Sequence, residues 1–382
     1  MRILHVIYDD IDNPWVGGGG ATRTLEIYDR IAGVGHQVTV VCGYYRGAAR
    51  REIRRGVRYR RLGLGRSHLI SRLSFMVGAA RLIKAGGYDI VIEDVSPFSP
   101  VGCPLWNRRV ACVACVQNLS GEHATRKYGA LGLGPKLVEK PLLSLYRNFI
   151  AVSPGIAEQL RRTVGGKINV KTIPNSAGQL FFRGDEATGD TTPCGGGYIL
   201  SLGRIDVYQK GLDRLIEGFD LLADRLPEIR LKIAGGGTKA QVARLHALTG
   251  RARHGERIEI LGQVDQARAA SLMRGALMLA MPSRYEAWPL SAIEAAAAGV
   301  PVVGSNIVGV KDAAPQYPQA HGRLVPEGDI DALVAAMSQV VTDRHLRQAI
   351  GERGIKWAKR FTWDALAAEQ LAFYESLIHK QQ

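Results

Sequence analysis

The sequence predicts an α/β protein with two doubly wound, mostly parallel sheets joined by a linker, and three observations indicate this fold class. Apolar strand-like runs alternate with stretches of helical periodicity along the whole chain, and continuous apolar strands separated by helices are typical of parallel sheets covered on both faces. The alternation stops at the polar segment 183–197 and then restarts. The chain has 382 residues, which is comfortable for two domains and too many for one compact core.

Strand-like runs define the two domains. Those of the first half are residues 2–8, 37–43, 57–63, 88–94, 109–117, 148–153 and 170–175. Those of the second half are residues 198–204, 230–237, 257–264, 276–283, 301–306 and 322–326. We therefore expect an N-terminal domain over 1–183, a linker over 184–197, a C-terminal domain over 198–360 and a final helix over 361–382. Both domains are expected to be Rossmann-like, with ligands at the carboxyl ends of the strands.

The composition excludes several classes of protein. The first residues enter an apolar strand directly, unlike a secretory signal peptide, and no apolar run approaches the ~20 residues that span a bilayer. Five scattered cysteines do not form a disulfide framework. Cys112 and Cys115 lie in a run that is typical of a buried strand, so we interpret them as core thiols rather than as a metal or redox site. These features predict a cytoplasmic protein.

The positive charge is concentrated in the first half of the chain. Residues 1–183 carry 27 Lys and Arg against 12 Asp and Glu, whereas residues 184–382 carry 23 of each kind. Within the first half, residues 46–61 contain eight arginines and one glutamate. For any single arginine there the simplest interpretation is a solvated strand pair. The imbalance of the whole domain nevertheless predicts contact with something anionic: a membrane surface, an acidic polymer or a phosphorylated substrate.

A glycine-rich segment follows the first strand, with Gly19 and Gly20 leading into a helix. Glycines in this place let backbone N–H groups approach an anion at the helix N-terminus. The segment is not G-x-G-x-x-G, and no acidic residue follows the second strand where an NAD site requires one. A phosphate loop and a generic tight turn both fit it, and it does not favour an NAD-dependent dehydrogenase.

Two cations follow the first strand of the second half. Arg204 comes directly after Gly203, and Lys210 precedes another glycine on the same strand-to-helix loop. Together they could bracket a diphosphate, because Arg offers a planar fork and Lys a point charge. The alternative is two ordinary surface cations. The neighbouring glycines and the position at a strand end favour the ligand site.

The stretch EAWPLSAIEAAAAG holds two glutamates with seven residues between them, Glu286 and Glu294. Pro289 stands between the glutamates and is suited to the first turn of a helix. Glu286 is therefore expected in a loop, and Glu294 about one turn inside the helix. The free N–H groups of Leu290 and Ser291 would point toward a phosphate. The two carboxylates are then spread along a ligand rather than paired as an acid and a base.

Taken in order, these motifs resemble the retaining glycosyltransferases of the GT-B, family-4 type, over nearly the whole chain. The matching parts are the glycine loop, GHQVTVV (35–41), TIPNS (172–176), GRIDVYQKG (203–211), LKIAGGG, ILGQV, the two-glutamate stretch with AGVPVV, and HGRLVPEGD (321–329). No single part is decisive, but the ordered set is specific. The resemblance implies a GT-B fold, in which two Rossmann-like domains face each other across a cleft and the C-terminal helix crosses back to the first domain.

The resemblance also implies the residues of the donor site. These are Gly19, Gly20, Gly203, Arg204, Lys210, Gly236, Val264, Glu286, Leu290, Ser291 and Glu294. Arg204 and Lys210 would hold the diphosphate, Glu286 would bond hydroxyls of the transferred sugar, and Glu294 would hold the ribose diol. With Gln117, the residues Glu286, Arg204 and Lys210 form the implied catalytic set.

The implied reaction is a same-face attack in which the leaving phosphate takes the acceptor's proton, so no protein nucleophile is required. Two fixed cations and a helix N-terminus can stabilise the nucleotide-diphosphate charge, and neither a metal nor a tightly bound cofactor is expected. An Asp-x-Asp pattern, which metal-dependent relatives use, does occur at 10–12 and at 329–331. We interpret both as helix caps and surface acids.

This sequence departs from the family pattern at two places. Gln117 stands where the family commonly has a histidine at the end of a first-domain strand, and it cannot titrate. His123 is a candidate to replace that histidine, although a loop histidine usually has no such role. Trp288 with Pro289 replaces the commoner Phe–Gly pair and adds an aromatic wall at the sugar end. Glu93 and Asp94, at another strand end, are candidates for binding or activating the acceptor hydroxyl.

The sequence therefore predicts a retaining glycosyltransferase that uses a nucleotide-diphosphate sugar, with UDP and GDP both open. The basic first domain favours an anionic or membrane-presented acceptor, such as a lipid-linked glycan or a cell-envelope polysaccharide, met at the inner face of the membrane. The alternatives are a sugar-nucleotide epimerase of the same architecture and a non-catalytic protein that binds an anionic glycan. Nucleic acid is not expected as a partner, because no basic patch is interleaved with aromatic residues.

Overall fold

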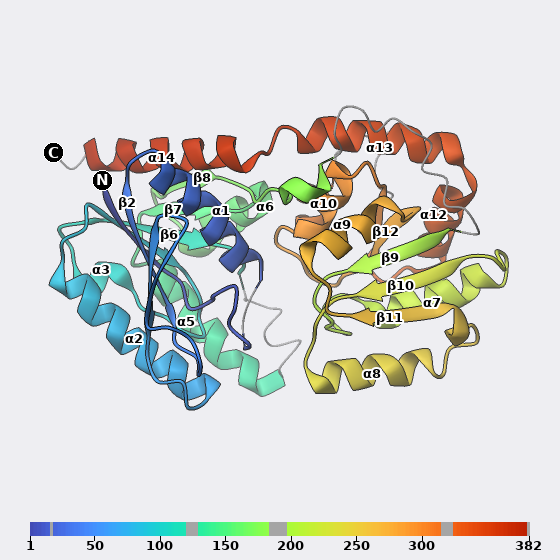
Figure 1. Cartoon of the computed structure of the whole chain (residues 1–382), viewed down its shortest axis with the longest axis horizontal. Helices are drawn as coiled ribbons and strands as arrows, with labels where there is room; N and C mark the ends of the chain where they lie inside the picture. Colours follow the sequence, from blue (N-terminus) through green and yellow to red (C-terminus); the bar gives the residue numbers. More distant parts are fainter. Residues whose placement is uncertain (16–17, 120–128, 183–196, 315–323, 380–382) are drawn as a thin grey trace. The chain divides into compact units, whose positions relative to one another are not determined.

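The computed structural model describes residues 1–15, 18–119, 129–182, 197–314 and 324–379. The chain forms two compact units (Figure 1). The first comprises Met1–Asn175 together with Trp363–Gln382, and the second comprises Ser176–Thr362. The linker expected at 184–197 lies almost entirely outside the described residues. Among the described residues, no helix is long and apolar enough to cross a membrane.

The first unit is built on an eight-stranded sheet with the order β3-β4-β2-β1-β5-β6-β7-β8. β3 runs antiparallel to β4, and the other neighbouring pairs are parallel. The strands are β1 (Arg2–Val6), β2 (Gln37–Gly43), β3 (Arg51–Arg54), β4 (Val57–Leu62), β5 (Ile90–Asp94), β6 (Ala111–Val116), β7 (Asn148–Ala151) and β8 (Asn169–Thr172). The strand-like runs predicted for this half are confirmed, and β3 with β4 forms the arginine-rich strand pair.

Helices connect these strands, and serine caps fix where some of them begin. The helices are α1 (Gly19–Gly33), α2 (His68–Ala85), α3 (Cys103–Trp106), α5 (Leu133–Leu143), α6 (Pro154–Val164) and α14 (Trp363–His379), with a 3-10 turn η1 (Gly129–Gly132). Ser67 Oγ accepts from the N–H of Ile70, and Ser153 Oγ accepts from the N–H of Ile156. These caps satisfy donors that have no partner inside the helix and start α2 and α6 at defined residues.

The C-terminal helix α14 packs on α1 of the first unit, as the family resemblance implied. Buried polar contacts join the two helices: the Tyr28 and Tyr374 hydroxyls lie 2.9 Å apart, and Arg23 Nη2 donates to Gln370 Oε1 at 2.5 Å. At the surface, Arg30 Nε donates to Asp364 at 2.6 Å. The last residues of the chain thus belong to the same unit as the first.

The second unit has a six-stranded, wholly parallel sheet with the order β11-β10-β9-β12-β13-β14. Its strands are β9 (Tyr198–Leu202), β10 (Arg230–Ala234), β11 (Ile258–Gly262), β12 (Met278–Met281), β13 (Val302–Ser305) and β14 (Leu324–Val325). Its helices are α7 (Leu212–Ala223), α8 (Lys239–Thr249), α9 (Gln266–Arg274), α10 (Leu290–Ala297), α11 (Val308–Ala313), α12 (Ile330–Thr342) and α13 (Arg344–Ala358), with 3-10 turns η2 (Gln179–Phe181) and η3 (Gly255–Arg257). The core lies between the sheet and these helices, with Phe219 and Met337 fully buried.

The four described cysteines are free thiols. Cys115 is buried and Cys112 is half-buried in β6, and burial raises the pKa of the Cys112 thiol to about 12. A thiol with so high a pKa is neutral at physiological pH and is a poor nucleophile and metal ligand. The interpretation of this pair as core thiols is confirmed.

Candidate active site

Lys210 and Glu286 meet at the carboxyl end of the second sheet. Lys210 ends the loop that follows β9, and Glu286 lies in the loop between β12 and α10. The Lys210 Nζ atom lies 2.6 Å from Oε1 of Glu286, and the Ser283 hydroxyl donates to the same oxygen at 3.1 Å. Glu286 is only 8% exposed. The structure therefore brings together a cation and a carboxylate that the sequence singled out separately, and it adds Ser283, which the sequence analysis missed.

Glycines allow the loops of this site to approach one another. Gly211 has φ 64°, and a Cβ atom there would lie 2.0 Å from the carbonyl oxygen of Pro282. A Cβ atom on Gly235 would lie 1.7 Å from the carbonyl oxygen of Gly203. Neither position can hold a larger residue without moving backbone. This close backbone packing holds Lys210 next to the loop that follows β12. It also holds the loop that follows β10 against the loop that follows β9.

Arg204 lies exposed on the same loop as Lys210. Its Nη2 donates to the side-chain oxygen of Gln209 at 3.2 Å, and within the described part of the chain it has no ion-pair partner. A guanidinium held by a neutral amide keeps its charge and most of its donors for another anion. Lys210, by contrast, is already paired with a carboxylate.

Helix α10 begins where the sequence placed it. Pro289 occupies the N-cap position, with φ −71° and ψ 115°, so it lies one residue before the predicted first turn. The helical hydrogen bonds start with Ala292, whose N–H donates to the Pro289 carbonyl at 3.1 Å. The N–H groups of Leu290 and Ser291 therefore precede the first helical bond, as expected for a helix start that can hold an anion.

Glu294 lies one turn inside α10 and is half-buried. Protein atoms surround its carboxyl group densely, and this burial raises its pKa to about 7. Among the described residues, no side chain pairs with it. A carboxyl group without a partner in a crowded place is suited to accept or donate hydrogen bonds to hydroxyls of a ligand.

Two further predicted donor residues follow neighbouring strands of this sheet. Gly236 follows β10, and its carbonyl accepts from the N–H of Ile205 at 2.7 Å. Val264 follows β11 and directly precedes Asp265, which caps α9. Both are half-buried. The predicted residues of the second half thus follow β9, β10, β11 and β12, at the edge where parallel strands end together.

Several contacts fix the loop that carries Glu286. A Cβ atom on Gly309, in α11, would lie 2.1 Å from the Glu286 carbonyl oxygen. Arg284 forms a bidentate pair with Asp213, with N–O distances of 2.8 and 2.7 Å. Sequence analysis missed these residues, since a lone glycine in a short helix and a distant ion pair leave no pattern in one sequence.

Trp288, which the sequence suggested as an aromatic wall at the sugar end, packs inside the second unit. It is 7% exposed, and its ring meets that of Phe361 edge to face with centroids 5.9 Å apart. The Phe361 carbonyl in turn accepts a hydrogen bond from Ser176 Oγ. Trp288 therefore attaches the Glu286 loop to the last residues of the second unit, because a buried indole gains more from packing than from exposure.

In the first unit, the structure brings Gly20 and Gln117 together. Gly20 is the second residue of α1, and a Cβ atom there would lie 3.8 Å from Cγ of Gln117. Gln117 Oε1 accepts from Asn175 Nδ2 at 3.4 Å, and Asn175 Oδ1 accepts from Arg23 at 2.9 Å. Gly19 begins the helix. His123 lies outside the described residues.

The expectation for Glu93 was wrong. Its carboxylate is 1% exposed and accepts from the N–H groups of Val101, Gly102 and Cys103 and from the Tyr146 hydroxyl. These donors hold the start of α3 and leave no oxygen for an acceptor. Asp94 lies at the end of β5; its side chain is 7% exposed, and its Oδ2 lies 3.1 Å from Nε2 of the buried His5. The two neighbouring acids therefore have different surroundings.

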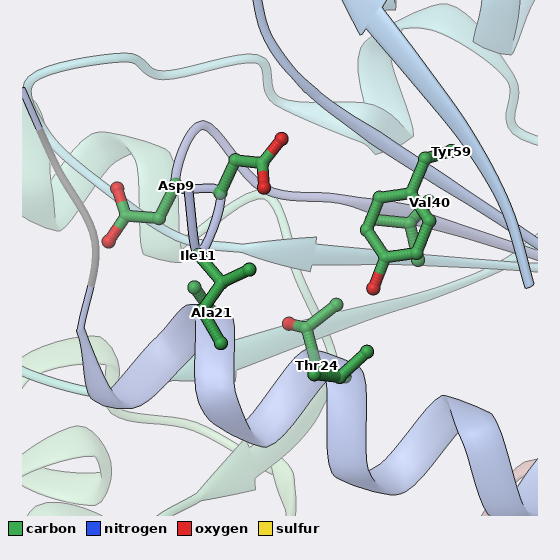
Figure 2. Close-up of a pocket in the computed structure, with 8 residues that line it drawn as sticks. Asp9, Ile11, Ala21, Thr24, Val40 and Tyr59 are labelled. Atoms are coloured by element: carbon green, nitrogen blue, oxygen red, sulfur yellow. The ribbon is translucent and has the colours of Figure 1, made fainter. Parts of the chain in front are cut away.

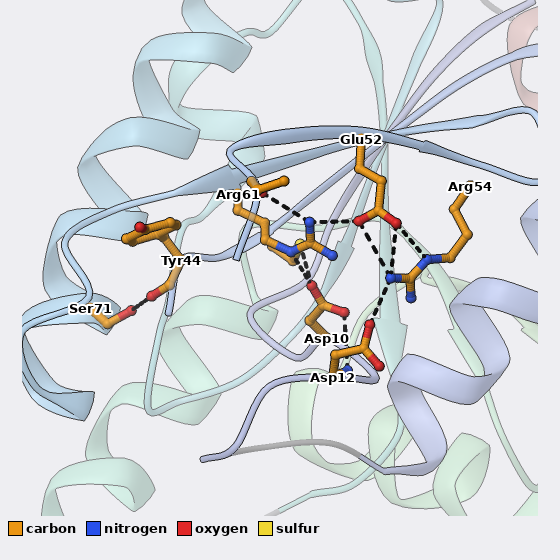
Figure 3. Close-up of polar contacts among 9 residues, drawn as sticks. Asp10, Asp12, Tyr44, Glu52, Arg54, Arg61 and Ser71 are labelled. Atoms are coloured by element: carbon orange, nitrogen blue, oxygen red, sulfur yellow. Dashed lines mark hydrogen bonds and ion pairs between the residues drawn. The ribbon is translucent and has the colours of Figure 1, made fainter. Parts of the chain in front are cut away.

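The interpretation of Asp10 as a surface acid was also wrong. Asp10 is 2% exposed and pairs with the buried Arg61 at 2.6 Å (Figure 3). Arg61 also donates to Glu52 at 2.8 Å, and this hydrogen bond lowers the pKa of Glu52. Asp12 is at the surface, paired with Arg54. The network ties the loop after β1 to β3 and β4, so part of the arginine-rich segment is structural.

The other Asp-x-Asp agrees with its prediction, since Asp329 caps α12 by accepting from the N–H of Ala332 at 2.8 Å. A small pocket lies beside the loop after β1, between Asp9, Thr24 of α1 and Tyr59 of β4 (Figure 2). Within the described ranges, no group of three or more His, Cys, Asp or Glu could hold a metal ion.

Two family models match the two halves of the chain. The glycosyl transferase 4-like domain matches residues 18–176, and the glycosyl transferases group 1 model matches residues 192–357. Together they include the glycine loop, Lys210, Glu286 and Glu294. The chain belongs to the glycosyl transferases group 1 family. The ordered motifs had indicated this family.

Relatives and solved structures agree with this membership. The chain is 31% identical to a phosphatidyl-myo-inositol mannosyltransferase of Mycolicibacterium smegmatis over 207 residues, 54% of this chain and 51% of that protein. It is 32% identical to a D-inositol 3-phosphate glycosyltransferase of Jonesia denitrificans over 185 residues, 47% of this chain and 43% of that protein. The chain thus aligns with about half the length of the curated relatives it matches.

The solved structures establish the fold of this group 1 family member as GT-B. A sucrose-phosphate synthase from Thermosynechococcus elongatus superposes with a TM-score of 0.83 at 21% identity, covering 100% of both chains. HepE of Anabaena, solved with UDP and glucose, superposes with a TM-score of 0.76 at 16% identity, covering 98% of this chain and 100% of that one.

Proposed function

We propose that this group 1 family member is a retaining glycosyltransferase. It transfers a sugar from a nucleotide-diphosphate donor to a hydroxyl group of an anionic or membrane-presented acceptor. The observation that carries the proposal is the pairing of Lys210 with Glu286 at the carboxyl end of the second sheet, beside the start of α10. A cation, a carboxylate and a helix N-terminus together match the phosphates and hydroxyls of a nucleotide sugar.

The chemistry follows from these groups. Departure of a nucleoside diphosphate moves negative charge onto the bridging phosphate oxygen, and groups already fixed at that place lower the barrier most. Lys210 and Arg204 supply positive charge, and the N–H groups of Leu290 and Ser291 supply donors. The Lys210 ammonium is held by Glu286 and so needs little reorganisation when the phosphate charge develops. These groups supply the positive charge that a metal provides in other transferases, and metal independence is part of the proposal.

Glu286 and Glu294 would bind opposite parts of the donor. Glu286 accepts from two protein donors through Oε1, so its Oε2 is the oxygen left for hydroxyls of the transferred sugar. Glu294 would hold the ribose diol, and Gly203, Gly236 and Val264 would lie near the nucleotide. The nucleotide is UDP or GDP; HepE, which shares the fold, was solved with UDP and glucose.

The first unit would supply the acceptor side. Gly19 and Gly20 would close on the donor, and Gln117 would hydrogen-bond a sugar hydroxyl without titrating. The leaving phosphate would take the acceptor's proton. Asp94 stays a candidate for orienting the acceptor hydroxyl, whereas Glu93 does not.

The acceptor is proposed from charge and from relatives. The positive charge of the first half favours a phosphorylated or lipid-linked acceptor, and the similar mycobacterial protein is named for a phosphatidylinositol acceptor. A lipid-linked glycan or a cell-envelope polysaccharide fits both observations. The enzyme would then act in the cytoplasm, at the inner face of the membrane.

The test begins with the donor. Thermal shift against a panel of UDP and GDP sugars identifies the base, and turnover of the stabilising donor is then measured with and without acceptor. Lys210→Ala and Glu286→Ala should each lower kcat/KM by about a hundredfold or more. The matched control is Arg214→Ala, which breaks the surface pair with Glu327 in the same unit and should leave turnover unchanged.

Three results would contradict the proposal. Full turnover in both Lys210→Ala and Glu286→Ala would show that the site lies elsewhere. Binding without hydrolysis or transfer of any donor would favour the glycan-binding alternative. A change of configuration at one carbon of the donor sugar, with no transfer to an acceptor, would favour the epimerase.

A further inference from the structure

Helix α2 presents apolar side chains to solvent as well as to the core. Ser71, Phe75, Ala79 and Ile83 are buried beneath it. On its outer side, Leu69, Leu73 and Val77 are 67%, 53% and 51% exposed, with Ile70 beside them. The spacing of four residues places these three on one stripe. A surface helix normally turns polar residues outward, but this stripe on the first turns of α2 is apolar.

Helix α6 of the same unit shows the usual arrangement. Its buried side carries Ile156 and Leu160, and its outer side carries Glu158 and Arg162, which pair at 3.0 Å. The apolar outer stripe of α2 is therefore not a general property of the helices in this unit. An outer apolar stripe is what a helix needs in order to lie on an apolar partner.

The apolar surface extends from α2 to α3, which packs against it. Leu105 and Trp106 of α3 are also exposed. We call Leu69, Ile70, Leu73, Val77, Leu105 and Trp106 the α2–α3 face. It is bordered by exposed cations: Arg66 before α2, Arg81 and Lys84 on its last turns, and Arg108 and Arg109 after α3.

Acidic residues are missing from this part of the chain. No Asp or Glu occurs in residues 53–88 or in residues 95–121, whereas nine Lys and Arg occur in residues 53–88 alone. A basic rim around an apolar centre complements a bilayer of anionic lipids, because the side chains enter the acyl region while the cations stay at the phosphates.

We infer that the α2–α3 face is a membrane-docking surface that seats the first unit on an anionic bilayer. The inference rests on the proposed function and deepens it, because a docked first unit would receive its acceptor directly from the lipid layer. Helix α2, with 18 residues and hence a length of about 27 Å, would lie in the interface along its length rather than cross the bilayer.

A second copy of the chain fits this face less well. Two copies related by a twofold axis would place the same basic rims against each other, and residues 53–88 and 95–121 carry no acidic residue that could pair with them. An anionic lipid surface satisfies the same cations. Charge therefore selects the membrane as the occupant.

The experiment uses the full chain and vesicles of phosphatidylcholine with 30% phosphatidylglycerol, compared with phosphatidylcholine alone, in a co-sedimentation assay. The wild type should bind the anionic vesicles, and about 0.5 M salt should weaken binding without abolishing it. Leu69→Ser with Leu73→Ser and Val77→Ser should lower the apparent affinity by about tenfold or more. The three residues replaced in this variant are exposed in the wild type, so the variant is expected to fold.

The matched control removes three exposed aliphatic side chains elsewhere, by Val34→Ser, Ile53→Ser and Leu180→Ser, and should bind as the wild type does. Trp106 gives a second signal: its emission should shift to the blue on binding, and Trp106→Phe should remove most of that shift.

Equal vesicle binding by the α2 triple variant and the wild type would overturn the inference. So would a wild type that ignores vesicles and forms a dimer that the triple variant does not form. Donor binding and hydrolysis in solution separate this inference from the proposed function. A wild type that transfers sugar but ignores anionic vesicles contradicts only the docking surface. Vesicle binding without binding of any nucleotide sugar contradicts only the glycosyltransferase.

Discussion

Lys210 and Glu286 lie 76 residues apart in the chain and meet at 2.6 Å in the second unit. The pair is held on both sides, since Gly211 packs on the backbone of Pro282 and Gly309 packs on the backbone of Glu286. Glu286 is buried and Lys210 is mostly buried. A charge pair in such a place is a weak source of stability, but losing one partner leaves a buried charge alone.

A double-mutant cycle should therefore find strong coupling between these two residues. Lys210→Met should lower the free energy of unfolding by about 1–3 kcal/mol, because it strands the Glu286 carboxylate. Adding Glu286→Gln should recover part of that loss. The coupling energy, measured by urea unfolding, should exceed about 1 kcal/mol.

The exposed pair Arg162 and Glu158 on α6 is the control for this cycle. A surface pair of this kind should couple by less than about 0.5 kcal/mol. If Lys210 and Glu286 couple no more strongly than this pair, they are not held together in solution.

Glu294 should make stability depend on pH. Its pKa is about 7 in the folded chain, against a value of 4.5 for a solvated glutamate. Between pH 4.5 and about 7, the Glu294 carboxyl is protonated to a greater extent in the folded chain than in the unfolded chain. The stability that this proton contributes is fully present below pH 4.5 and is lost as the pH rises to about 7. The loss amounts to at most about 3 kcal/mol.

Glu294→Gln tests this directly, because glutamine has nearly the same shape and does not titrate. The free energy of unfolding of the wild type minus that of the variant should fall from pH 5 to pH 7 and stay level from pH 7 to pH 9. A difference that is constant over the whole range would show that Glu294 titrates normally. With a stabilising nucleotide sugar, the same variant should also bind more weakly if Glu294 holds the ribose.

Gly309 should be intolerant of even one methyl group. A Cβ atom there would lie 2.1 Å from the Glu286 carbonyl oxygen and 2.4 Å from its carbonyl carbon, both backbone atoms. Gly309→Ala should therefore displace the Glu286 loop, lower stability by more than about 1 kcal/mol and reduce kcat/KM at least tenfold. Melting temperature and donor turnover measure the two effects.

Gly134 in α5 is the matched control, since its Cβ position has no neighbour within 4 Å. Gly134→Ala should be neutral or slightly stabilising, as alanine favours a helix by up to about 1 kcal/mol over glycine. Equal behaviour of the two alanine variants would mean that α11 does not support the loop.

The strands, helices and donor loops could be predicted because each has a local pattern. Apolar runs marked the strands of both sheets, and Pro289 with the alanine run marked the start of α10. Lys210 was found because it precedes Gly211 in a loop after a strand, and Glu286 because it lies in the loop between Pro282 and Pro289. Only the resemblance joined them into one site. The position of a residue after a strand is a local property of the sequence.

The environment of a side chain could not be predicted in this way. Glu93 and Asp94 are neighbours at one strand end, yet Glu93 is enclosed by the turn at Val101–Cys103 and Tyr146. Asp10 was misassigned for the same reason, since Arg61, its partner, is 51 residues away. Burial and pairing depend on contacts between distant segments, which one sequence does not display.

Arg23 provides the last prediction. It is 2% exposed, and its guanidinium donates to the carbonyls of Ile173 and Pro174, to Asn175 Oδ1 and to Gln370 Oε1. These partners are neutral, and they lie where the chain leaves the first unit and on the helix where it returns. A planar fork can join both segments, whereas a lysine cannot.

Arg23→Met should therefore leave buried carbonyl groups without donors and loosen α14. We expect a loss of about 3 kcal/mol, with faster hydrogen exchange of amides in α14 and near Ile173. Arg23→Lys should rescue little of it. Arg30→Met, which removes the pairs of Arg30 with Glu26 and with the exposed Asp364, should cost less than about 1 kcal/mol and leave exchange near Ile173 unchanged. If Arg23→Met and Arg30→Met are equally mild, Arg23 does not hold the two segments together.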